Sequence, residues 1–82
     1  MASVEDKLDA LISAEIYRSR DEVISDAMSA LLTLKPSLKI DMAVNLYKNK
    51  KVSLWRGADI ASLTLEKFKD ILASRSIRIE HE

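Results

Sequence analysis

Apolar residues recur at intervals of three and four over most of the 82-residue chain, the spacing that places side chains on one face of an α-helix. The spacing of apolar residues predicts a first amphipathic helix over residues 3–15, with acidic residues in its first turn. A second helix is predicted to begin near Arg20, because Ser19 stands three residues before Glu22, the spacing of a capping box. It ends near Leu34, because Pro36 disfavours a helical conformation at the residue before it. The first part of the chain is therefore predicted to be a pair of helices.

The remainder of the chain predicts three more short helices. The third begins at Pro36 or at the residue after it, because proline suits a first helical turn. The hydroxyls of Ser53 and Thr64 are placed to cap a fourth helix, residues 54–61, and a fifth that begins at residue 65. Five short helices are expected in total.

The last apolar residues follow a different period. Ile77 and Ile79 alternate with charged residues, which predicts a short strand. Such a strand needs a partner, either the residues around Val52 or a symmetry-related copy of itself, because its backbone groups would otherwise stay unpaired. The predicted fold is one all-α domain with a short C-terminal strand, in which residues 1–34 form the helix pair and residues 36–79 the other elements.

The segment that contains the fourth and fifth helices is spaced like a compact helix-turn-helix. Gly57, Ala58 and Ala61 are small enough to let two helices cross closely. Leu63 in the turn and Phe68 on the second helix would fill the angle between them. Because a helix-turn-helix usually contacts DNA, this spacing indicates a DNA-binding protein.

The net charge of zero conceals a strong asymmetry. Residues 1–34 hold seven acids and three bases, a balance of 3 − 7 = −4. Residues 35–78 hold ten bases and four acids, a balance of 10 − 4 = +6. Any contact with phosphate is therefore expected from the second half. The alternative is that these charges only solvate helix faces.

Composition argues against several other functions. The chain has no cysteine, which excludes thiolate catalysis and disulfides, and its single glycine excludes a phosphate-cradling loop. His81 lies in a terminal tail without fixed geometry, so we expect no metal, no cofactor and no enzymatic activity. The absence of a long apolar run and of a signal peptide predicts a cytoplasmic protein that does not enter a membrane. A chain this short buries a limited core, so a homodimer is expected.

The stretch from Leu8 to Leu32 contains Y-R-S-R-D-E-V-I followed by regularly spaced apolar residues. It resembles the helix pair of ribbon-helix-helix repressors. In those repressors a strand precedes the first helix, pairs with a second subunit and contacts bases, whereas only residues 1–3 precede the helix here. The resemblance therefore implies helix pairing and dimerisation but no base-contacting residue.

From Tyr17 to Ile79 the chain is similar to small prokaryotic proteins catalogued as uncharacterised protein family 175. The similarity rests on D-M-A-V-N-L-Y-K-N-K-K-V-S-L-W-R-G-A-D-I-A-S-L-T-L-E-K-F-K-D-I-L and a closing I-R-I. It implies a helical DNA-binding protein of antitoxin type, often encoded beside a PIN-domain ribonuclease toxin. The sequence departs from the family's pattern at Trp55, at Gly57 and at Ser62, where glycine is usual in the turn.

The candidate DNA contacts lie on the fifth helix and at the start of the fourth. The fifth helix also exposes Glu66 and Asp70, which repel phosphate unless one of them accepts from a cytosine amino group. The free amides at the start of the fourth helix favour phosphate contacts by nearby cations. The predicted DNA-binding residues are Lys48, Lys50, Lys51, Arg56, Thr64, Lys67 and Lys69.

Three apolar residues are candidates for a partner or dimer interface: Trp55, Ile77 and Ile79. Trp55 lies about 100° from the buried stripe of its helix. Packing against the third or fifth helix is favoured slightly over a role as an interface anchor. The alternative function is a protein-interaction module that masks a partner without binding DNA, which the acidic first half favours.

Overall fold

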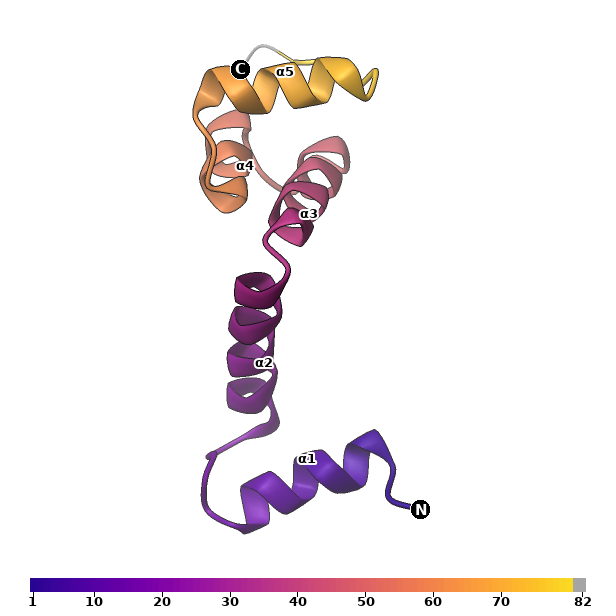
Figure 1. Ribbon diagram of the computed structural model, residues 1–82, viewed down its shortest axis with the longest axis vertical. Helices are drawn as coiled ribbons and strands as arrows, with labels where there is room; N and C mark the ends of the chain where they lie inside the picture. Colours follow the sequence, from indigo (N-terminus) through magenta and orange to yellow (C-terminus); the bar gives the residue numbers. More distant parts are fainter. Residues whose placement is uncertain (81–82) are drawn as a thin grey trace. The chain divides into compact units, whose positions relative to one another are not determined.

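The computed structural model describes residues 1–80 (Figure 1). These residues form five α-helices and no strand, which confirms the predicted all-α class and the number of helices. His81 lies outside the described residues. The helices are α1 (Val4–Ser13), α2 (Arg20–Leu34), α3 (Ser37–Lys48), α4 (Leu54–Ala61) and α5 (Leu65–Ser74). None of them combines the length and the apolar character that crossing a bilayer requires.

The chain divides into two compact units, Met1–Leu34 and Lys35–Glu82. The division coincides with the proline that was predicted to end the second helix. α2 stops at Leu34, and Pro36 occupies the position before the first residue of α3. Proline suits this position because its fixed φ is helical and its missing N–H would be unbonded there in any case.

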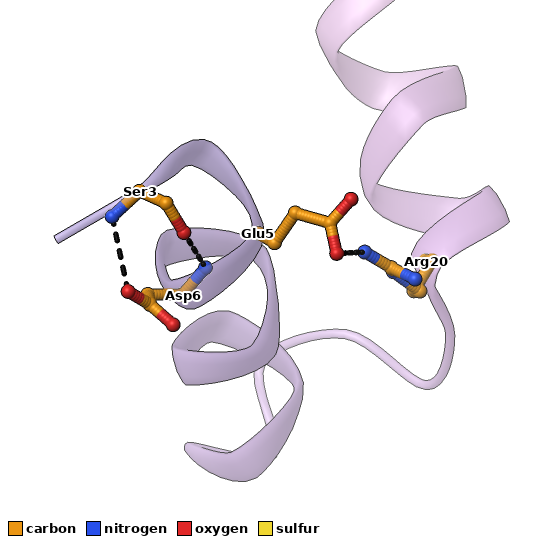
Figure 2. Close-up of polar contacts among 4 residues, drawn as sticks. All are labelled: Ser3, Glu5, Asp6 and Arg20. Carbon is orange, nitrogen blue, oxygen red and sulfur yellow. Dashed lines mark hydrogen bonds and ion pairs between the residues drawn. The ribbon is translucent and has the colours of Figure 1, made fainter.

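In the first unit, polar contacts of side chains fix the start of each helix. The Ser3 hydroxyl accepts a hydrogen bond from the Asp6 amide, and the Asp6 carboxylate accepts one from the Ser3 amide, both at 3.0 Å (Figure 2). This capping box satisfies two amides at the start of α1. Glu5 on α1 pairs with Arg20 at the start of α2, 3.2 Å apart (Figure 2). The predicted cap of α2 is also present, since the Glu22 amide donates to the Ser19 hydroxyl at 3.2 Å.

The first unit buries little of its apolar surface. Val23 is its one buried residue, at 7% exposure. α1 and α2 contact each other, but much of their apolar surface remains open. The large apolar side chains that remain exposed in this unit are Met1, Val4, Leu11, Ile16, Ile24, Met28, Leu31 and Leu34.

The second unit has a closed core to which each of its three helices contributes. Phe68 and Leu72 of α5 are completely buried. The rings of Phe68 and of Tyr47 on α3 form a T-shaped pair, with centroids 6.2 Å apart and planes at 81°, a favourable aromatic geometry. The remaining buried core residues are Ala43 and Val44 of α3 and Ala58 and Ala61 of α4.

Gly57 permits the close approach of α4 to α5. A Cβ atom at this position would lie 2.7 Å from both Cε2 and Cζ of Phe68. Such a distance is far below ordinary carbon contact, so only glycine fits without movement of the ring. The prediction that small residues let these helices cross closely is confirmed at this position.

Four helices of the described chain are followed, within two residues of their end, by a non-glycine residue in the left-handed conformation. These residues are Glu15, Lys50, Ser62 and Ser76, with φ between 58° and 62°. After α4, the Ser62 amide donates to the Asp59 carbonyl and the Leu63 amide to the Ala58 carbonyl, both at 3.0 Å. This pair of bonds is a Schellman motif, which satisfies the last carbonyls of a helix and reverses the chain.

The predicted C-terminal strand is absent from the described chain. Ile77 and Ile79 instead pack against the core of their own unit. The Ser76 turn directs the chain back toward α3, where the Glu80 amide donates to the Tyr47 hydroxyl at 2.8 Å. Because the apolar side chains and the Glu80 amide find partners within the unit, this segment needs no neighbouring strand. The two isoleucines are half-buried in this arrangement.

Candidate nucleic-acid interface

The two helices and the turn predicted for residues 54–72 are present, and local hydrogen bonds explain their boundaries. The Ser53 hydroxyl accepts from the Arg56 amide at 3.1 Å at the start of α4. The Thr64 hydroxyl accepts from the Lys67 amide at 3.2 Å at the start of α5. Both residues are therefore the caps that the sequence predicted. Ser62 forms the left-handed turn between the helices.

The outer face of α5 carries both charge signs. Lys67 is exposed and Lys69 is half-buried, and each is adjacent in the sequence to a carboxylate, Glu66 or Asp70. The four charges cancel, so this face alone has no positive excess. Thr64 at the helix start is exposed as well, and its hydroxyl accepts a hydrogen bond from the Lys67 amide.

Arg56 stands in the first turn of α4 and forms an ion pair. Its guanidinium lies 3.1 Å from the Asp59 carboxylate one turn later, and both side chains are about two-thirds exposed or more, at 66% and 73%. Exposed pairs of this kind contribute about 0–1 kcal/mol. A phosphate could therefore replace Asp59 as the partner of Arg56 at little energetic cost.

The lysines after α3 lie around a tight reversal of the chain. Lys50 adopts the left-handed conformation, and the Lys51 amide donates to the Leu46 carbonyl at 2.8 Å. All three lysine side chains are exposed, including that of Lys48. The Lys50 ammonium lies 3.9 Å from the Glu80 carboxylate, a weak and solvated contact.

Two of these lysines, Lys48 and Lys50, border a hollow of about 600 Å³ that the sequence did not reveal. Four cations line it, two from the end of α3 and two from the segment that follows α5. The polar and charged lining residues are Tyr47, Lys48, Lys50, Ser53, Arg75, Ser76, Arg78 and Glu80. Of the predicted contacts, Lys48 and Lys50 lie in this hollow, whereas Lys51 and the contacts on α4 and α5 do not.

Arg75 and Arg78 were not among the predicted contacts. Arg78 was assigned to the predicted strand, whereas in the observed structure both arginines line the hollow beside the end of α3. Arg75 also pairs with Asp41 of α3 at 2.9 Å. The sequence carried one signal for this role, namely that both residues belong to the basic second half.

Trp55 does not pack inside its unit. Its side chain is 70% exposed on the surface of α4, so the favoured prediction of intramolecular packing is wrong. The helix turns its small residues, Gly57, Ala58 and Ala61, toward the core, and Trp55 falls on another face of this short helix. Exposed tryptophans are typical anchors of protein interfaces, so the predicted interface role of Trp55 stays a prediction.

Among residues 1–80, the Tyr17 hydroxyl has a perturbed pKa. The hydrogen bond from the Tyr17 hydroxyl to the Asp26 carboxylate raises the pKa of Tyr17, with smaller effects from desolvation and from nearby negative charge. This contact lies in the first unit. In the same range, no group of three or more His, Cys, Asp or Glu side chains is arranged to hold a metal ion.

Fold and site together define a small all-α protein with a basic C-terminal unit and a largely open N-terminal helix pair. The chain belongs to the Uncharacterised protein family (UPF0175), which matches residues 21–82. It is 38% identical over 77 residues to a UPF0175 protein of Halobacterium salinarum, and the match covers 94% of this chain and 79% of the relative. The resemblance inferred from residues 17–79 is thereby confirmed. No solved structure matches the chain significantly.

Proposed function

We propose that this protein binds DNA and acts as a transcriptional regulator or as the antitoxin of a toxin pair. The observation that carries the proposal is the α4–turn–α5 arrangement, in which small residues of α4 meet Phe68 and Thr64 caps a helix with lysines on its outer side. We interpret this arrangement as a helix-turn-helix, a motif whose second helix enters the major groove. We propose no enzymatic activity for this protein.

In this proposal the two helices and the basic loop have different tasks. Thr64, Lys67 and Lys69 contact the groove or its edges from α5. Arg56, Lys51 and the lysines at the end of α3 bind backbone phosphates, which position the protein without reading sequence. The positive balance of the second unit supports this division, because phosphate contacts dominate the affinity for DNA.

Binding to labelled DNA from upstream of the gene, measured by fluorescence anisotropy over a range of salt concentrations, tests the proposal. We expect affinity to fall with salt, and each lysine that contacts phosphate to contribute about 0.9 to the slope of log K against log salt. Lys67→Ala and Lys69→Ala should weaken binding, whereas Lys7→Ala, at an exposed lysine of α1, is the matched control. Absence of binding at low salt, or equal effects of all three substitutions, would contradict the proposal.

A second candidate function is supported by the open apolar surface of the first unit. Eight large apolar side chains are exposed there, in a segment with a net charge of −4. Such a surface is typical of protein interfaces. We propose as the alternative a module that covers a partner protein, for which a PIN-domain ribonuclease or a second copy of this chain is the candidate. Co-expression with the product of the neighbouring gene, followed by purification, tests this alternative. The wild-type protein should copurify with that product, and the Leu31→Asp variant should not.

A further inference from the structure

The hollow of about 600 Å³ in the second unit has the size of a small-ligand site. Its walls are the end of α3, the loop that leads to α4, and the segment after α5. These walls come from sequence segments far apart, and the hydrogen bond between the Glu80 amide and the Tyr47 hydroxyl joins two of them. The hollow is therefore a product of the folded unit.

Its charge selects an anion. The lining contains four cationic side chains, Lys48, Lys50, Arg75 and Arg78, and one carboxylate, Glu80, a balance of 4 − 1 = +3. Arg75 is engaged by Asp41, and Lys50 faces Glu80 at 3.9 Å. All four cations are exposed, but among the described residues no ion pair involves Lys48 or Arg78, so these two are the cations best placed to meet a ligand. A guanidinium beside an ammonium suits the oxygens of a phosphate.

The lining also has an apolar part. Val52 and Ile77 border the hollow, and both are half-buried and packed against the core, so their positions are set by the fold. Ser53 and Ser76 add hydroxyl groups nearby. A ligand that fits both parts carries a phosphate and a small organic group.

We propose that this hollow binds a phosphate ester, with the phosphate held by Lys48 and Arg78 and the organic group lying over Val52 and Ile77. Glu80 acts as an internal competitor, because its carboxylate faces Lys50 and repels an incoming phosphate. The ester is either a unit of the DNA backbone, in which case the inference rests on the proposed function, or a free small molecule.

The test is a titration of the full, ¹⁵N-labelled chain followed by NMR, first with inorganic phosphate and then with a deoxynucleoside monophosphate. We expect saturable shifts at the amides of residues 48–53 and 75–80, and tighter binding of the nucleotide than of phosphate. Lys48→Gln and Arg78→Gln should each weaken binding by about fivefold, the effect of one charge at contact distance in water. Glu80→Gln should strengthen it by about the same factor, and Lys7→Gln in α1 should change nothing.

Shifts that do not saturate, or a loss with Lys7→Gln equal to that with Arg78→Gln, would overturn the inference, because both indicate unspecific attraction. Weaker binding by Glu80→Gln would overturn it as well. Addition of duplex DNA then identifies the source of the phosphate. Displacement of the nucleotide by DNA supports a backbone phosphate, and retention supports a small-molecule ligand. Saturable nucleotide binding by a protein that does not bind DNA would refute the proposed function and leave this site standing.

Discussion

Replacing Gly57 by alanine should destabilise the second unit, against the ordinary preference of helices. Gly57 lies inside α4, where alanine is favoured over glycine by about 1 kcal/mol. The added methyl group would, however, lie 2.7 Å from two carbons of the Phe68 ring. That ring is completely buried and cannot rotate into solvent. Overpacking of this kind costs about 1–3 kcal/mol. Over most of that range the cost exceeds the gain of about 1 kcal/mol from the higher helix propensity of alanine.

The expected net loss is about 1 kcal/mol, which lowers Tm by roughly 4–8 °C in a domain of this size. Urea and thermal unfolding followed by circular dichroism measure it. The decisive comparison is the same substitution in a Phe68→Leu background, where the shorter side chain removes the two ring carbons that the new methyl group would meet. There Gly57→Ala should be neutral or stabilise by up to about 1 kcal/mol. An equal loss in both backgrounds, or a gain in stability in the wild-type background, would refute the reasoning.

Two further predictions concern a turn and a tyrosine. Ser62→Gly should raise the free energy of unfolding by about 0.5–1 kcal/mol, because glycine adopts the left-handed conformation without steric strain, although it also has more freedom in the unfolded chain. Ser62→Ala keeps that strain and should show no such gain in urea unfolding. Asp26→Asn should lower the pKa of Tyr17, measured by ultraviolet absorbance of tyrosinate in a Tyr47→Phe background. Because that pKa is raised above its ordinary value of 10.0 in the folded state, the stabilisation is complete below pH 10.0 and is lost as pH rises through the raised pKa. An unchanged pKa in Asp26→Asn would show that the hydrogen bond is not its cause.

Much of the secondary structure followed from local sequence. The caps at Ser19, Ser53 and Thr64 each bond an amide three residues away, so their effect depends on neighbours alone. Pro36 separates α2 from α3 for an equally local reason. The Ser3 and Asp6 capping box was not predicted as such, although the acids in the first turn indicated a helix start at the same place.

The candidate site was predicted only in part. The lysines after α3 and the residues of α4 and α5 were identified because cations and small residues can be recognised one by one. Arg75 and Arg78 were not identified, because the hollow that they line forms only when the tail turns back at Ser76. The alternation around Ile77 has the period of a strand, and a period alone does not say which surface will bury the apolar residues.

The sequence by itself determined the helices, their caps, the division at Pro36 and the segregation of acidic from basic residues, since each depends on interactions within a few residues. Only the tertiary structure decided that the tail packs on the core, that Trp55 remains exposed and that two arginines join the lysines of α3 around a hollow. These outcomes depend on contacts between residues as far apart as Tyr47 and Glu80. Such contacts form where the folded unit offers a matching surface, which no local pattern specifies.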